Sequence, residues 1–194
     1  MARAKKAKKK TASRSRGKTT ARARSGGQDA IAVLKADHRQ VEQWFEEFDK
    51  SRSSSRKETL ARQICRALQV HTQIEAEIFY PAFLEATGEK DIHHEAEIEH
   101  DSAKKLIAEI EKSSPEEDYF DAKVTVLSEM IKHHVREEEK SGGMFGEARK
   151  ARMDLKQLGE RLSARKAELE SGNGRGGRAT RMANTHERGS NAVS

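Results

Sequence analysis

Hydrophobic residues in the middle of the chain recur three and four positions apart, which is the period of an amphipathic α-helix. Serine, glycine and proline residues interrupt this pattern and supply signals for helix ends. Pro81 falls in the last turns of the second helical segment and predicts a kink or break there. The pattern as a whole predicts five helices, over about residues 29–50, 55–86, 91–112, 115–140 and 147–170.

Local capping signals set the expected ends of these helices. Ser55–Glu58 reads as a capping box for the second helix, Asp91 as a cap for the third, and Ser114–Glu117 as the start of the fourth. The first four helices are joined by short connections, which favour antiparallel neighbours. We therefore predict an all-α fold: an up-down antiparallel four-helix bundle over residues 29–146. A further, highly charged helix over residues 147–170 is expected to dock outside the bundle or to mediate self-association.

Charge is distributed unevenly along the 194 residues, which contain 38 Lys and Arg against 32 Asp and Glu. Residues 1–28 contain eleven basic residues and no acidic one, residues 29–170 carry a net charge of −8, and residues 171–194 carry +3. Neither end shows a hydrophobic period, so neither can offset its ordering entropy by burial. We predict a disordered basic tail over residues 1–28 and a disordered Gly/Arg-rich tail over residues 171–194.

These compositional features bound the functions to consider. The basic tail can contact DNA or RNA without sequence preference by displacing counterions, or it can serve only to keep the protein soluble. No apolar run approaches the ~18–20 residues of a membrane span, so no membrane partner is expected. The single cysteine, Cys65, favours a reducing compartment. We expect a cytoplasmic protein, located at the nucleoid if the basic tail holds DNA.

Ionisable residues interrupt the stripes that the first four helices direct inward. Burying such groups without partners costs several kcal/mol per charge, against a total stability of about 5–15 kcal/mol. A metal cluster would satisfy all of them together, and imidazole with carboxylate suits iron, zinc or manganese. The set comprises one histidine per helix and two glutamates one turn after a histidine: His38, His71, Glu75, His100, His134 and Glu138.

These residues, with the motifs around them, resemble the hemerythrin HHE cation-binding domain over about residues 29–150. The motifs are HTQIEAEIFYP around His71 and Glu75, EIEHDSAKKLIAEI around His100, and HHVREEE around His134. The resemblance implies a four-helix bundle around a non-haem di-iron centre. It also implies that the four histidines are terminal ligands and that the two glutamates, Glu75 and Glu138, bridge the irons.

Two departures from the oxygen-carrying hemerythrins bear on function. These proteins have a second histidine one turn after the third-helix ligand, where this chain has Lys104, and they bridge with an aspartate where it has Glu139 beside Glu138. Fewer nitrogen ligands leave more open positions on the metal. This favours reaction with O2, peroxide or nitric oxide over reversible carriage of one gas.

Neighbouring residues offer competing assignments. His133 and Glu137 have the same spacing as His134 and Glu138, but His133 is rotated by about 100° from the inward stripe. We therefore prefer His134 and Glu138. Cys65 follows a stripe position on the second helix, and we interpret it as a buried structural thiol.

Three hypotheses follow from these observations. The first is a di-iron protein that reacts with O2, peroxide or nitric oxide in iron handling, stress response or sensing; whether it turns over as an enzyme stays open. The second is a nucleic-acid-associated protein that uses residues 1–28 and carries a protective metal site. The third is a metal-free helical interaction module held by His–Glu pairs. No Ser/His/Asp arrangement, P-loop or dinucleotide fingerprint is present, so no catalytic side chain or organic cofactor is assigned.

Overall fold

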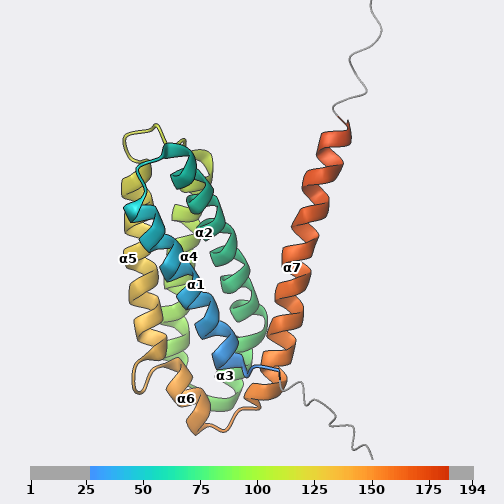
Figure 1. Cartoon of the computed structure of the whole chain (residues 1–194). Coiled ribbons are helices and arrows are strands. Elements are labelled where there is room, and N and C mark those ends of the chain that lie inside the picture. Colours follow the sequence, from blue (N-terminus) through green and yellow to red (C-terminus); the bar gives the residue numbers. More distant parts are fainter. Residues whose placement is uncertain (1–26, 184–194) are drawn as a thin grey trace, which may run out of the picture.

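The computed structural model describes residues 27–183 of the chain, and every regular element within them is a helix (Figure 1). In chain order the elements are α1 (Ala30–Lys50), α2 (Ser54–Ile74), the π-helical turn η1 (Glu75–Phe79), α3 (Tyr80–Thr87), α4 (Lys90–Lys112), α5 (Phe120–Glu139), α6 (Met144–Lys150) and α7 (Leu155–Ala183).

Helices α1, α2, α4 and α5 lie side by side and form the bundle (Figure 1). Helix α2 packs against α1 and α4, and α5 closes the ring by packing against α4 and α1. The short connections make neighbours in sequence neighbours in space. The predicted all-α four-helix bundle with an additional C-terminal helix is thus confirmed. None of the helices in the described part of the chain is long and apolar enough to cross a membrane.

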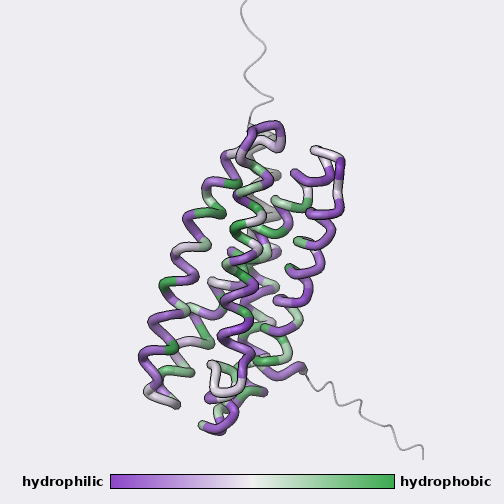
Figure 2. The backbone as a smooth tube through the Cα atoms, turned by 90° about the vertical axis from the view of Figure 1, so that its left-hand side faces the viewer, coloured by the Kyte–Doolittle hydropathy of each residue, from purple (hydrophilic) through white to green (hydrophobic). Residues whose placement is uncertain are grey.

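The core of the bundle is divided into two apolar clusters. The first cluster includes Leu34 and Phe79 and joins the start of α1 to the end of α2, η1, α3, α6 and α7. The second includes Phe48 and Ile107 and fills the other end of the bundle. Hydrophobic and hydrophilic stretches alternate along each bundle helix, as the amphipathic period requires (Figure 2). Between the two clusters lies a layer of buried polar side chains, which includes His38.

A π-helical turn replaces the kink predicted at Pro81. Proline lacks a backbone N–H, and its ring crowds the carbonyl four residues earlier, so a regular α-helix cannot continue through it. The chain widens by one residue instead, and the N–H of Tyr80 donates to the carbonyl of Glu75. Positions i and i+5 lie about 140° apart on an α-helix. The wider turn brings Glu75 and Tyr80 closer to one face, and both side chains are buried.

Three predicted helix starts are wrong by a few residues. Helix α2 is capped by Ser53, whose hydroxyl accepts the backbone N–H three residues later, and not by Ser55. Helix α4 begins before Asp91 and has no side-chain cap. Helix α5 begins at Phe120, because Ser114 and the residues after it form turns closed by their own backbone hydrogen bonds. More than one polar residue near each of these helix starts could serve as the cap, and packing between helices determines where the helix begins.

The single helix predicted over residues 147–170 is divided in the structure. A turn separates α6 from α7, and Arg152 within it adopts a left-handed backbone with φ of 54°. Asp154 Oδ1 then accepts the backbone N–H of Gln157 at 3.0 Å and caps the start of α7. Sequence reasoning missed this cap because the charged pattern runs through both helices without interruption.

The C-terminal part of the chain also differs from expectation. Residues 171–183, predicted as part of a flexible tail, continue α7 as a helix. The remainder of that tail, residues 184–194, lies outside the described residues, as do residues 1–26 of the predicted basic tail.

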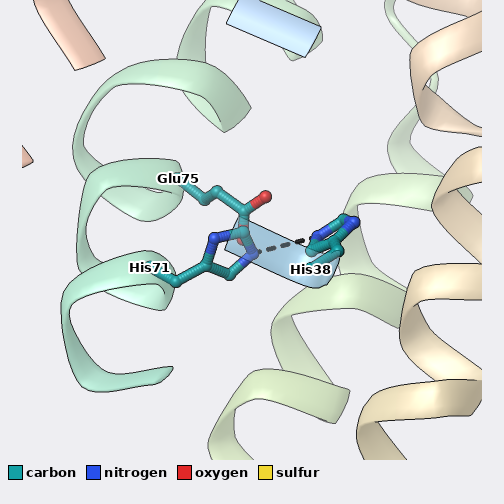
Figure 3. A group of neighbouring side chains, drawn as sticks. All are labelled: His38, His71 and Glu75. Carbon is teal, nitrogen blue, oxygen red and sulfur yellow. Dashed lines mark hydrogen bonds and ion pairs between the residues drawn. The ribbon is translucent and has the colours of Figure 1, made fainter. Parts of the chain in front are cut away.

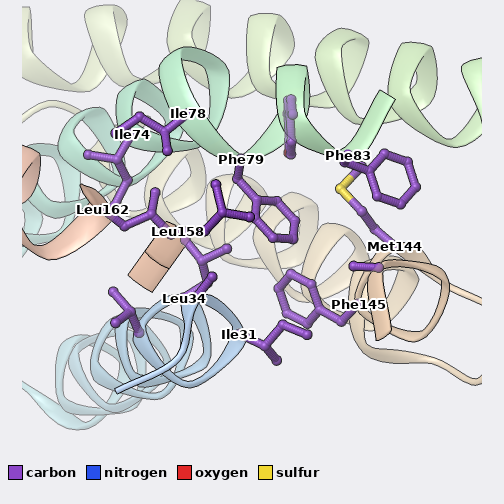
Figure 4. Packing of buried hydrophobic residues seen from close by; sticks show 14 of the residues in the cluster. Ile31, Leu34, Ile74, Ile78, Phe79, Phe83, Met144, Phe145, Leu158 and Leu162 are labelled. Carbon is purple, nitrogen blue, oxygen red and sulfur yellow. The ribbon is translucent and has the colours of Figure 1, made fainter. Parts of the chain in front are cut away.

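The first half of α7 packs on the bundle. Leu158 and Leu162 are buried in the first apolar cluster, between α1 and the α2–η1 segment (Figure 4). Lys166 forms an ion pair with Asp37 of α1, on the side of α1 that leads to the polar layer. Helix α7 therefore packs on the outside of the bundle and contacts a residue next to the polar layer.

Candidate metal centre

The six predicted residues converge between the two apolar clusters. Each bundle helix directs one histidine inward, and the glutamates come from η1 and the end of α5. Their burial confirms the inward stripes read from the helical period. The exposed fractions are 3% for His38, 4% for His71, 0% for Glu75, 3% for His100, 4% for His134 and 2% for Glu138.

One half of the site is formed by His38, His71 and Glu75 (Figure 3). The Nε2 atoms of His38 and His71 lie 3.1 Å apart, and His71 Nε2 lies 3.2 Å from Glu75 Oε2. One potential ligand atom from each of the three residues lies within 4.8 Å of the other two. A single ion placed among them could contact all three residues.

The other half is formed by His100 and His134, again with Glu75. The Nε2 atoms of the two histidines lie 3.2 Å apart, and Glu75 Oε2 is 3.3 Å from His100 Nε2. Glu138 reaches both halves, with Oε2 at 3.5 Å from His38 Nε2 and Oε1 at 3.8 Å from His134 Nε2. Both carboxylates are therefore placed between two pairs of imidazoles, as bridging groups of a dinuclear centre are.

Acidic side chains lie behind three of the histidines, and those behind His38 and His134 are within hydrogen-bond distance. Glu139 Oε1 lies 2.9 Å from His38 Nδ1, Glu99 Oε2 lies 2.7 Å from His134 Nδ1, and Asp37 Oδ2 lies 3.5 Å from His71 Nδ1. A carboxylate at Nδ1 favours a proton there and leaves the lone pair on Nε2, the atom that faces the centre. Sequence reasoning did not assign these roles. For two of them the available signal was an acidic residue directly before an inward histidine, Asp37 before His38 and Glu99 before His100, and each lies behind the histidine of the neighbouring helix.

Tyr80 is a further buried polar residue that the sequence analysis did not single out. Its hydroxyl lies 3.1 Å from His100 Nε2 and donates to Glu138 Oε1 at 3.3 Å. Burial, together with the charge of Glu75, raises the pKa of this phenol well above its usual value. Tyr80 therefore stays protonated and acts as a hydrogen-bond donor at the edge of the site. Its position five residues after Glu75, next to Pro81, was the signal that sequence reasoning did not use.

Several buried acceptors of this site have no hydrogen-bond donor from the protein. Both carboxylate oxygens of Glu75 and Oε2 of Glu138 have no hydrogen-bond donor. Burial raises the pKa of Glu75, but the charges of His71 and His100 outweigh it and lower the pKa to about 2. Burial and the charge of Glu75 raise the pKa of Glu138 well above its usual value. Burial, with the nearby His71, lowers the pKa of His38 to about 4. Imidazole nitrogens beside carboxylate oxygens that lack a donor form the mixed donor set that a cation requires.

The competing histidine and glutamate lie at the surface. His133 contacts Glu99 Oε1 at 3.2 Å with half of its side chain exposed, and Glu137 pairs with Lys140 outside the bundle. Lys104, at the position of the additional histidine in oxygen carriers, is also exposed and pairs with Asp101. None of these side chains points into the polar layer, in agreement with the inward stripe.

Comparisons with known proteins agree with this architecture. The sequence profile of the hemerythrin HHE cation binding domain matches residues 29–141. The crystal structure of a hemerythrin HHE cation binding domain-containing protein from Mycobacterium kansasii superimposes with a TM-score of 0.63, at 22% identity, over 83% of this chain and 95% of the other. A curated relative from Nostoc sp., named a DNA nickase, is 31% identical over 107 residues. That match covers 55% of this chain and 30% of the relative, so the chain spans about a third of that protein.

The family profile covers more than half of the chain and includes all six inward residues of the polar layer. The groups of histidines and carboxylates that it encloses in the structure are suited to bind cations. The chain thus belongs to the hemerythrin HHE cation-binding domain family.

Proposed function

We propose that the six buried residues hold two metal ions and that these ions are iron. In this proposal His38 and His71 are end ligands of one ion, His100 and His134 are end ligands of the other, and the two glutamates bridge them. The observation that supports the proposal most strongly is the sharing of Glu75 by two three-residue groups, each fully buried. The orphaned carboxylate oxygens give the same indication, because two cations would satisfy them at once.

The proposal of iron rests on the family resemblance, with zinc and manganese as the alternatives to be tested. Mixed imidazole and carboxylate ligands without thiolate suit all three metals. If iron is bound by these residues, it would supply the redox chemistry for reaction with O2, peroxide or nitric oxide. Lys104 lies outside the site, so fewer nitrogen ligands are available than in the oxygen carriers and more positions are left for a small molecule.

The protein's own contribution is orientation, exclusion of water and control of protons. The carboxylates at Nδ1 fix the ring orientation of His38 and His134, and the two apolar clusters close the site above and below. Tyr80 holds its proton on the hydroxyl oxygen and donates it in a hydrogen bond to Glu138 Oε1. The hydroxyl proton of Tyr80 is thereby held at the edge of the proposed metal centre, where a small anionic product of the metal reaction would need a proton. The role we assign is iron handling, stress response or sensing in the cytoplasm.

Metal analysis of matched variants tests this proposal. Purified protein should contain about two irons per chain, as expected for a dinuclear bundle site, with an oxo-to-iron band in the near ultraviolet. The double variant His134→Ala/Glu138→Ala should lose the iron and the band, whereas His133→Ala/Glu137→Ala, with the same spacing on the same helix, should keep both. Retention of iron in the first variant would contradict the proposed ligands. Zinc in place of iron would contradict the redox role, and manganese in place of iron would contradict the assignment of the metal.

A second candidate function is contact with nucleic acid through residues 1–28. Two observations favour it: the segment contains eleven basic residues and no acidic one, and the Nostoc relative is named a DNA nickase. A polycationic segment binds phosphate backbones with an affinity that falls steeply with salt. Fluorescence anisotropy with labelled duplex DNA should detect salt-dependent binding that disappears when residues 1–28 are deleted, while the metal content stays unchanged. Equal binding by the truncated chain would refute this role.

A further inference from the structure

A cavity of about 140 Å³ lies between α4, the end of α5 and the turn before α6. Its inner wall includes His134 and Glu138 of the candidate metal centre, and its outer wall includes the exposed Glu95. Glu138 is 2% exposed, and its Oε2 atom has no hydrogen-bond donor. The cavity therefore connects the surface with a carboxylate whose bonding is incomplete.

Two carboxylates in the wall of this cavity, Glu95 and Glu99, lie close to His133, which lines a neighbouring cavity of about 390 Å³ together with Glu99 and His134. Glu95, Glu99 and His133 each offer a ligand atom within 4.8 Å of the other two. His133 Nε2 lies 3.2 Å from Glu99 Oε1, while the other oxygen of Glu99 lies 2.7 Å from Nδ1 of the inner His134. Glu99 thus contacts both histidines, and the outer group repeats the imidazole-and-carboxylate chemistry of the inner site at the surface.

The charge around this opening is negative. Glu95, Glu99 and Glu137 line it, and its cationic neighbour Lys140 is paired with Glu137. A cleft with one sign of charge and low-dielectric walls concentrates ions of the opposite sign. A divalent cation also needs ligands that replace its waters before it enters a site that is nine-tenths buried.

We propose that Glu95, Glu99 and His133 form a capture site for divalent cations, from which the ions pass through the cavity to Glu138 and His134. This inference rests on the proposed function of the inner site as a metal centre. The capture site changes the rate at which metal ions enter and not the amount of metal bound at the end, because Glu95 and His133 do not contact the inner carboxylates.

A second opening provides the natural comparison. A cavity of about 470 Å³ on the other side of α4 is lined by His94, Glu97 and Lys104 and reaches Tyr80 and His100. At its inner end the Tyr80 hydroxyl lies 3.1 Å from His100 Nε2, and neither Glu75 nor Glu138, the buried carboxylates with oxygens that lack a donor, lines this opening. Lys104 and Asp101 at this opening form an ion pair, so their charges offset each other. The second opening is therefore a poorer route for metal ions.

Stopped-flow loading of the metal-depleted full-length protein with Co²⁺ tests the route. The double variant Glu95→Gln/His133→Gln should load about tenfold more slowly than the wild type, since focusing by a charged cleft is worth at least that much. Its final cobalt content and spectrum should equal those of the wild type. The control Glu97→Gln/His94→Gln removes the same residue types from the second opening and should load at the wild-type rate.

Two outcomes overturn the capture site alone: wild-type loading by the first variant, or equal slowing by the control. A wild-type protein that takes up no cobalt overturns the proposed metal centre, and the capture site with it. The two failures differ in the endpoint of the reaction, which separates them in a single experiment.

Discussion

Replacing one glycine of α7 should destabilise the protein, although the same change in a free helix would stabilise it. Gly159 lies inside α7, where glycine costs about 0.8–1.0 kcal/mol relative to alanine. A Cβ at this position would lie 2.2 Å from the carbonyl oxygen of Gln28 and 2.8 Å from the backbone nitrogen of Ala30. These are backbone atoms at the capped start of α1, and they cannot move aside as a flexible side chain could.

The magnitude follows from what the helix loses when it shifts. Moving α7 away from α1 partly exposes Leu158 and Leu162, which are 5% and 0% exposed. Full exposure of one such side chain costs about 1.5–3 kcal/mol. Overpacking costs of about 1–3 kcal/mol agree with this range. After subtracting the gain in helix propensity, Gly159→Ala should lower the free energy of unfolding by about 1–2 kcal/mol.

Urea unfolding followed by circular dichroism and by the fluorescence of the single tryptophan, Trp44, measures this difference. The matched control is Gly172→Ala in the same helix, where a Cβ would meet nothing within 4 Å. It should raise the free energy of unfolding by up to about 1 kcal/mol. If Gly159→Ala stabilises the protein as much as the control does, α7 does not pack on α1 and the reasoning is wrong.

Three further predictions concern single residues. Gly143→Ala would place a Cβ 2.1 Å from the carbonyl oxygen of Glu137 and 2.9 Å from that of Glu138. It should therefore destabilise the protein by about 1–3 kcal/mol, as measured by thermal unfolding. It should also lower the metal content, as measured by elemental analysis. Burial raises the pKa of Asp37, but hydrogen bonds and charges of His71 and Lys166 lower it overall. Lys166→Met should therefore move this pKa upward in a carboxyl NMR titration of the metal-free protein. An unchanged titration would argue against the ion pair. Burial raises the pKa of the Cys65 thiol to about 12, so at pH 8 only about one molecule in 10⁴ carries the thiolate, and alkylation by iodoacetamide should be slow until the protein is unfolded.

The positions of the six candidate ligands could be predicted from the sequence because helical geometry is local. Residues three and four apart share a face, so the stripe that contains Ile131 and His134 must point inward if the apolar residues do. The same rule separates His134 from His133 without any knowledge of the neighbouring helices. Four amphipathic stripes joined by short connections then favour one bundle.

The capping motifs show where local reasoning stops. Ser53 and Ser55 can both cap a helix, and Asp91 is as good a cap by residue type as Asp154. The choice depends on which register buries the stripe best against the other helices, and this is not encoded within one turn of the chain.

The sequence by itself determined the helices, the inward face of each and the chemical types that meet in the core, because these follow from periods of a few residues. Packing between helices decided the π-helical turn that brings Tyr80 beside Glu75, the placement of carboxylates from neighbouring helices behind three of the four histidines, and the docking of α7. It also decided which openings reach the centre. These features depend on the rotation and translation of one helix relative to another, which are set by packing between residues far apart in the chain.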